Sequence, residues 1–295
     1  MWLGQETGHN NVLMWIGQET GHNHVRRPQS PTSVMPPLIT LTTDFGEGSA
    51  YVAEMKGVIL SINRAAQIVD VAHNIPPQNV RQAAILLAEA TTWFPAGSIH
   101  VAVVDPGVGT ERRIVYASIG DQQFVAPDNG VLSRLAAKSR PSRIIALENS
   151  EHWLPSVSNT FHGRDIMAPV AAQVSLGMEP DRLGPAQSEM VELNWPAPQV
   201  EINSIRGEVT WIDGFGNLIT NVSAASLASI PDPHRAIIEM GEQTIRGFAR
   251  TYGDQPSDTL VALAGSAGFL EIAVVNGNAA ARLSAGVGAS ILVRW

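Results

Sequence analysis

The 295-residue sequence contains no cysteine and only two lysines, Lys56 and Lys138. Without a thiol, disulfides, thiolate zinc sites and a cysteine nucleophile are excluded, so serine, carboxylate and histidine side chains must carry any chemistry. The chain has 19 basic against 27 acidic residues and a net charge of -8 at pH 7. Because a nucleic-acid surface is normally basic, this charge argues against a nucleic-acid partner and against recruitment to an anionic membrane.

Long hydrophobic runs are also missing. No segment approaches the ~20 apolar residues of a membrane span, and the N-terminus has only a short apolar run at residues 12–16. That run lacks the charged start and the roughly 7–15 apolar residues of a secretory signal. We therefore expect a cytoplasmic protein with no membrane partner.

The N-terminus carries a tandem repeat, in which MWLGQETGHNN at 1–11 returns as MWIGQETGHNH at 14–24. Two short, polar copies cannot bury a core of their own. Because a linker rich in Pro, Ser and Arg follows, residues 1–37 are predicted to be a disordered leader and linker. His9, His22 and His24 allow a metal site as the alternative, but this composition is more typical of an unstructured segment.

From residue 38 the pattern alternates between strand and helix, which predicts parallel strands joined by crossover helices. Residues 38–192 are therefore predicted to form an α/β domain with a mostly parallel sheet flanked by helices. Strands are expected at 38–43, 68–72, 99–104, 113–118, 123–125 and 143–147, and helices at 51–62, 80–92, 131–137 and 165–176. After a Pro-rich, irregular stretch, residues 193–295 contain short β-rich runs joined by Gly, Asn and Asp turns, which predicts a C-terminal antiparallel β-barrel.

Three motifs place polar side chains at the ends of predicted elements. In VVDPGVGTERR at 103–113, a strand ends in Asp105, turns through Pro and two Gly, and continues to Arg112 and Arg113. LTTDFG at 41–46 ends another strand in Asp44, and TFHGRD at 160–165 brings His162 to a helix start. Ligands bind at the carboxyl ends of strands in parallel sheets, although an ordinary surface ion pair is the alternative for the first motif.

These motifs resemble the S-adenosylmethionine hydroxide adenosyltransferases, relatives of the fluorinases and chlorinases. Further matches are VDVAH at 69–73, APDNG at 126–130, DGFGNLITN at 213–221 and GSAGFLEIAVVNGNAA at 265–280, so the resemblance runs from about residue 38 to 295. It implies an α/β N-terminal domain and a C-terminal β-barrel domain. It also implies hydrolysis of S-adenosyl-L-methionine to adenosine and L-methionine, by an activated water that attacks ribose C5′.

In this family, Asp105, Arg112 and His162 match the set that handles water. Water is a poor nucleophile, with a pKa of ~15.7, and a guanidinium within hydrogen-bond reach favours hydroxide. Asp105 would hold Arg112 and accept a hydrogen bond from the water, while His162 would complete the polar cage or take the proton. For His162 the alternative is a helix-start histidine that bonds only to backbone. Arg113, Arg164 and Asp165 are predicted to be structural ion-pair partners.

The other candidates are predicted to bind substrate. Asp44 can accept both hydroxyls of a ribose or cap the following turn, and the resemblance favours the ribose. Asp213 can accept the methionine ammonium and Asn217 can hold adenine or backbone, although a hairpin turn would use the same residues. Ser266 offers a hydroxyl to a carboxylate, but its neighbour Ala267 stands where family members often carry Arg or Ser. Further candidates are Asn129, Phe215, Tyr252, Asn278 and Ala279, of which the aromatic rings would stack on adenine and Asn278 with Ala279 would read its edge.

No metal or cofactor is expected, because S-adenosyl-L-methionine is the substrate and no metal-ligand motif occurs from residue 38 onward. His73 and His100 lie in or beside apolar strands and are expected to be core residues with satisfied hydrogen bonds.

Two other functions would use the same motifs. A halogenase would deliver halide to the same carbon, but the halide enzymes of this family lack the Asp-Arg-His set and carry Tyr at the position of His162. A non-catalytic adenosine or S-adenosylmethionine sensor would bind without turnover. The resemblance also implies a homotrimer, with each site shared between the N-terminal domain of one subunit and the C-terminal domain of its neighbour.

Overall fold

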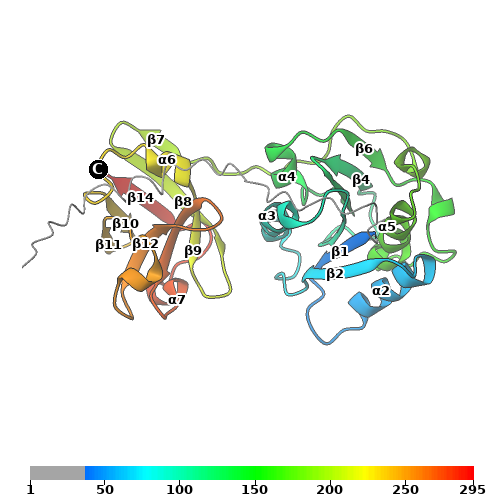
Figure 1. Ribbon diagram of the computed structural model, residues 1–295, viewed down its shortest axis with the longest axis horizontal. Helices are drawn as coiled ribbons and strands as arrows, with labels where there is room; N and C mark the ends of the chain where they lie inside the picture. The colour runs from blue at the N-terminus through cyan, green and yellow to red at the C-terminus, as the bar shows by residue number, and fades with distance from the viewer. Residues whose placement is uncertain (1–36) are drawn as a thin grey trace, which may run out of the picture. The chain divides into compact units, whose positions relative to one another are not determined.

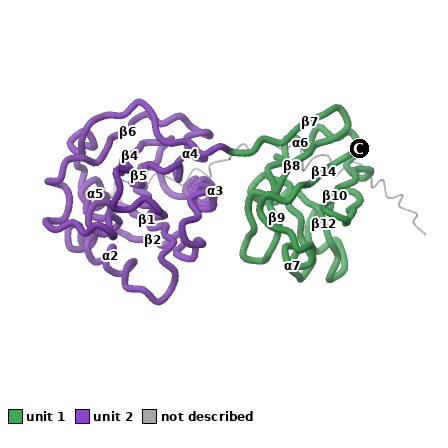
Figure 2. Tube along the Cα trace, turned by 180° about the vertical axis from the view of Figure 1, so that it is seen from behind, with its two compact units in different colours: residues 1–28, 195–295 green, residues 29–194 purple. Residues whose placement is uncertain are grey.

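The computed structural model describes residues 37–295, so the predictions for the repeat and its histidines lie outside the described residues. The described chain divides into two compact units, one ending at Asn194 and the other formed by Trp195–Trp295 (Figure 2). Among the helices of residues 37–295, none has the length and apolar character needed to cross a membrane.

The first unit contains a six-stranded sheet in the order β2-β1-β3-β5-β4-β6 (Figure 1). Its strands are β1 (Leu38–Thr43), β2 (Gln67–Ala72), β3 (Ile99–Val103), β4 (Ile114–Ile119), β5 (Gln122–Pro127) and β6 (Arg143–Ala146). β1 pairs in parallel with β2 and β3, and β3 pairs in parallel with β5. β4 runs antiparallel to β5 and β6, because the short turn at 120–121 leaves no room for a crossover helix. The predicted α/β class with a mostly parallel sheet is confirmed.

Helices cover both faces of this sheet. The helices are α2 (Tyr51–Ile62), α3 (Val80–Ala90), α4 (Ser133–Lys138) and α5 (Ala168–Ser175), with short turns of helix η1 (Thr91–Trp93), η2 (Ser150–His152) and η4 (Pro180–Leu183). α2 and α5 share a core with Val101 and Val103 of β3, whereas α3 and α4 share a second core with Ala102. Successive β3 residues therefore point into different cores, which is why this strand is buried along its whole length and is apolar except for His100.

The second unit is an antiparallel sheet in the order β11-β10-β14-β8-β9-β13-β12, with β7 paired to β8 (Figure 1). Its strands are β7 (Gln199–Glu201), β8 (Ser204–Ile212), β9 (Leu218–Ser223), β10 (Ile237–Met240), β11 (Gln243–Arg246), β12 (Leu260–Ala264), β13 (Phe269–Val274) and β14 (Ser290–Arg294). β11 and β12, at the two ends of this order, contact each other. The sheet therefore nearly closes around a core that includes Ile205, Leu218 and Ile272, and the predicted barrel is confirmed. Short helices α6 (Ala224–Ala228), η5 (Tyr252–Asp254) and α7 (Ala279–Leu283) lie between strands.

Candidate active site

The loop after β3 folds back so that Arg112 binds Asp105. Arg112 Nε donates to both carboxylate oxygens at 2.9 Å, and Nη2 donates to Oδ2 at 2.5 Å. The two side chains are only 11% and 4% exposed. Gly109 lets the loop close, because its φ of +78° suits glycine and a Cβ there would lie 2.3 Å from the Asn159 carbonyl oxygen. The sequence thus folds this loop into a shielded ion pair rather than a solvated turn.

His162 joins this pair from a different segment. It precedes one turn of π-helix, η3 (Gly163–Met167), and its Nδ1 lies 2.9 Å from Arg112 Nη2. Gly163 allows the approach, since a Cβ there would lie 2.9 Å from Cγ1 of Val103 at the end of β3. π-helical turns are frequent at functional sites.

The hydrogen bond to Arg112 fixes the protonation state of His162. A guanidinium only donates, so His162 Nδ1 accepts, and the neutral ring carries its hydrogen on Nε2. Burial lowers the pKa of His162 below 6.5 and the charge of Arg112 lowers it further, against the opposing effect of Asp105. In this arrangement Nε2 is a hydrogen-bond donor.

Asp44 leaves the sheet at the same edge as Asp105. Thr43 of β1 and Val103 of β3 are register partners in parallel strands, so the residues that follow them emerge on one side of the sheet. Asp44 Oδ2 accepts a hydrogen bond of 2.7 Å from the backbone N–H of Gln78. This bond reaches a residue 34 positions along the chain rather than the turn that follows Asp44, and it occupies one of the two carboxylate oxygens.

An aromatic cluster links the segments of Asp44 and His162. The rings of Phe45, Tyr51 and Phe161 pack edge to face, with centroids 5.1 to 5.6 Å apart. Reasoning from the sequence missed this cluster, although Phe45 and Phe161 directly follow or precede the candidate residues in their motifs. Such ring pairs contribute about 0.5–1.5 kcal/mol each to stability beyond the effect of burial. They therefore help to hold the two segments against each other.

The remaining candidates of the first unit bond to other groups of the chain. Asn129 Nδ2 donates to the carbonyl of Val104 at 2.9 Å and so holds the residue before Asp105. The expected ion pairs form, with Arg113 bound to Asp128 at 2.6 Å and Arg164 bound to Asp165 at 2.7 Å.

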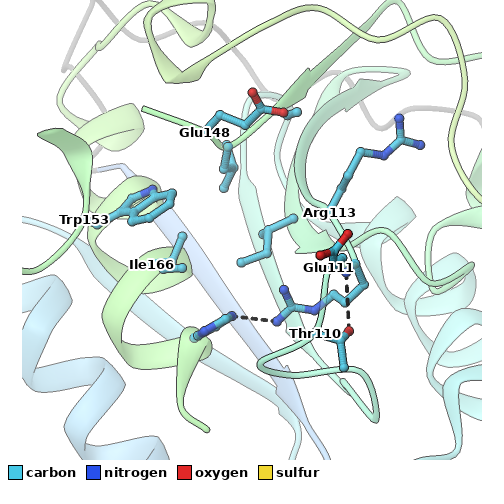
Figure 3. A pocket seen from close by; sticks show the side chains of 11 residues that line it. Thr110, Glu111, Arg113, Glu148, Trp153 and Ile166 are labelled. Carbon is cyan, nitrogen blue, oxygen red and sulfur yellow. Dashed lines mark hydrogen bonds between the residues drawn. The ribbon is translucent and has the colours of Figure 1, made fainter. Parts of the chain in front are cut away.

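A cavity of about 260 Å³ opens beside the Arg112–His162 contact. In Figure 3, Trp153 and Ile166 lie on one side of it and Thr110, Glu111 and Arg113 on the other. The cavity therefore gives small molecules access to the polar atoms of the site.

In the second unit, Asp213 organises the turn between β8 and β9. Its Oδ1 accepts from the backbone N–H groups of Phe215 and Asn217, and its Oδ2 accepts from Asn217 Nδ2, all at 2.9 Å. These residues therefore form the hairpin turn between β8 and β9 that was the alternative to substrate binding. Phe215 itself is 80% exposed and its ring is open to a ligand.

The start of α7 packs against this turn. A Cβ on Gly216 would lie 2.2 Å from the side chain of Asn278, and Asn278 Oδ1 caps α7 by accepting from Ala281 N at 2.7 Å. Ala279, the first residue of α7, is fully buried. Five predicted substrate-binding residues therefore gather around one turn. Asp213, Phe215 and Asn217 lie in it, and Asn278 and Ala279 lie beside it at the start of α7.

Tyr252 and Ser266 lie near a residue that the sequence reasoning did not single out, Glu271. The hydroxyl of Tyr252 donates to Glu271 Oε1 at 2.5 Å, and Glu271 Oε2 lies against Gly265, the neighbour of Ser266. Burial raises the pKa of Glu271; the bond from Tyr252 opposes this shift and the charge of Asp213 adds to it. The sequence did carry a signal for Glu271, because it is a glutamate inside the β-rich part of the motif at 265–280.

The catalytic candidates and Asp44 thus belong to the first unit, and the candidates from Asp213 onward belong to the second. Within residues 37–295, no three His, Asp or Glu side chains gather into a group that could hold a metal ion.

Two family models match the chain. The SAM hydroxide adenosyltransferase N-terminal domain matches residues 39–184, and the corresponding C-terminal domain matches residues 207–292. The chain belongs to this family. Both matched domains include the site segments described above.

Named relatives agree with this membership. A protein named (R)-S-adenosyl-L-methionine hydrolase from Salinispora arenicola is 38% identical over 252 residues, 83% of this chain and 92% of that protein. One of the same name from Thermus thermophilus is 39% identical over 245 residues, 80% and 91% of the two chains. A fluorinase from Actinoplanes sp. is 28% identical over 218 residues, 65% and 73% of the two chains.

The family fold is also found among solved structures. The crystal structure of an uncharacterized conserved protein from Thermotoga maritima superposes with a TM-score of 0.82 at 38% identity. The match covers 87% of this chain and 100% of that one.

Proposed function

We propose that this chain is an enzyme that hydrolyses S-adenosyl-L-methionine to adenosine and L-methionine. The observation that carries the proposal is the hydrogen-bonded set of Asp105, Arg112 and His162, which is shielded and lies at the sheet edge that also bears Asp44. The relatives named (R)-S-adenosyl-L-methionine hydrolase support the same substrate and reaction.

In the proposed reaction, water oxygen forms a bond to ribose C5′ while the bond from C5′ to the sulfonium sulfur breaks. Sulfur keeps the electron pair and leaves as the neutral thioether of methionine, and the water gives up one proton. The Arg112 guanidinium stabilises the developing hydroxide, and Asp105 is the carboxylate beside it that receives the proton. Of the two roles expected for His162, the tautomer inferred from its hydrogen bond with Arg112 supports the polar cage, because Nε2–H donates to the water rather than removing its proton.

Substrate binding is assigned to both units. Asp44 accepts the ribose hydroxyls, Asp213 accepts the methionine ammonium, and the exposed ring of Phe215 stacks on adenine. Because these residues lie in separate units, we include in the proposal the homotrimer with shared sites that the family resemblance implies. A cytoplasmic location completes the proposal.

The relatives are named for the R configuration at sulfur. We propose the same preference here. Incubation with the separated sulfonium epimers should show consumption of the R epimer first, and equal rates would contradict this part.

The deciding experiment is incubation of the protein with S-adenosyl-L-methionine in ¹⁸O-labelled water, followed by mass analysis of the products. Label in the 5′-hydroxyl of adenosine establishes both the nucleophile and the bond that is cleaved. Parallel samples contain chloride or fluoride. If only 5′-halo-5′-deoxyadenosine forms, the halogenase alternative is correct, and binding without any product indicates a sensor.

A further inference from the structure

Glu271 is a buried carboxyl group on the outer face of the barrel wall. Its neighbours in β13, Leu270 and Ile272, point into the barrel core. Because side chains alternate along a strand, Glu271 points the other way, on the face where Ala273 joins a small apolar cluster with Leu263. Nevertheless Glu271 is only 6% exposed.

The segment that carries Tyr252 covers this face. Ala249 packs on the same small cluster, and η5 (Tyr252–Asp254) follows a few residues later. Tyr252 is 41% exposed and its hydroxyl is bound by Glu271 Oε1 at 2.5 Å. One end of this side chain is therefore anchored while part of the ring remains available to a ligand.

The backbone around Glu271 is shaped to hold the carboxylate in place. A Cβ on Gly265 would lie 2.5 Å from Glu271 Oε2, so a larger residue there would require the carboxylate to move. The register between β13 and β9 shifts between Phe269 and Glu271. Such irregularities re-aim side chains and are frequent beside functional sites.

We propose that Glu271 is a positioning residue that fixes the ring of Tyr252 for contact with the nucleoside part of the substrate. The proposal rests on the proposed function, since it names what the Tyr252 ring contacts. A tyrosine anchored by its hydroxyl loses little further freedom when it binds a ligand. Glu271 itself does not touch the reacting atoms, so its removal should weaken binding and leave the chemical step intact.

The test compares Tyr252→Phe, Glu271→Leu, the double variant and Glu271→Gln with the wild-type protein. Removing either partner of the hydrogen bond should raise KM, and the Kd for adenosine, by about tenfold, with kcat within about twofold. The double variant should be no worse than either single variant, because both remove the same bond. Glu271→Gln keeps a carbonyl acceptor for the phenol and should stay within about threefold of wild type.

Two further measurements separate positioning from general damage. Glu239→Leu removes another barrel glutamate, which pairs with Arg294, and should leave KM and kcat unchanged. Burial raises the pKa of the Tyr252 phenol and the bond to Glu271 raises it further. With only 3 tyrosines in the chain, an absorbance titration should show one phenol whose pKa falls in Glu271→Leu.

The outcomes also separate this inference from the proposed function. If wild type cleaves S-adenosyl-L-methionine but Tyr252→Phe leaves KM and the adenosine Kd unchanged, or the double variant multiplies the single effects, the inference alone is wrong. If wild type binds adenosine without cleaving the substrate, the proposed hydrolysis is wrong. The coupling between Tyr252 and Glu271 is then measured from the adenosine Kd values of the same four variants. If Glu271→Leu does not fold, Tyr252→Phe and Glu271→Gln decide the question. A wild-type protein that neither cleaves the substrate nor binds adenosine contradicts both.

Discussion

Arg112 donates a hydrogen bond of 2.9 Å to Nδ1 of His162, and the same guanidinium forms a hydrogen-bonded ion pair with Asp105. Arg112 thus links Asp105, just after β3, to His162, which lies more than 50 positions further along the chain. A guanidinium only donates hydrogen bonds, so Arg112 is the donor to both partners.

Arg112→Lys should lower kcat by roughly 10²-fold or more, the scale on which loss of an electrostatic group acts. Lysine keeps the charge but lacks the planar fork that binds Asp105 and His162 together. The matched control is Arg113→Lys, at the next residue, whose partners are Asp128 and Gln187. Steady-state kinetics should show full kcat for the control; equal losses in both variants would mean that Arg112 has no special role.

The rate should fall in acid as His162 becomes protonated. Protonation removes the acceptor at Nδ1 and sets a second positive charge beside Arg112. Because burial and Arg112 lower the pKa of His162, the midpoint of this loss should lie below pH 6.5. In His162→Gln the rate should be lower and this limb of the pH profile absent. A midpoint above pH 6.5 would contradict the neutral tautomer.

His100 should make the stability of the fold pH-dependent. It is fully buried, bonded to Thr40 and Gln122, and burial lowers its pKa from 6.5 to about 4. Between pH 6.5 and 4 the unfolded chain binds a proton at His100 that the folded chain does not. The contribution of neutral His100 to the free energy of unfolding is therefore fully present above pH 6.5 and is lost as the pH falls toward 4. The loss should reach about 3 kcal/mol. Denaturant unfolding at several pH values should show a shallower dependence for His100→Asn, and an unchanged slope would refute the assignment.

Mixing two inactive chains tests the shared site. Arg112→Ala removes a residue of the first unit, and Asp213→Ala removes one of the second. If subunits share sites, dissociation and reassembly of the mixture should restore part of the activity, because some interfaces combine two unmutated halves. No recovery despite proven subunit exchange, or a monomer with full activity, would place the whole site in one chain.

Much of the fold follows from local pattern. The helical spacing at 51–62 and the β-rich run at 38–43 match α2 and β1 residue for residue, because one face or both faces of these segments are buried. The antiparallel course of β4 could not be read from its sequence, since direction depends on which strand it pairs with. β9 was not predicted as a strand, because the turn residues of its motif masked the run that follows them.

The sequence by itself determined which chemical groups the protein has, namely carboxylates, arginine and histidine without any thiol, and its ordered motifs determined the family. Only the tertiary structure decided which of these groups meet. Gly109 and Gly163 permit the close backbone approaches that bring His162 to Arg112, and the cover over β13 buries Glu271 beneath Tyr252. Motifs are local in sequence, whereas protonation state and partner depend on contacts between distant segments, so these were fixed only by folding.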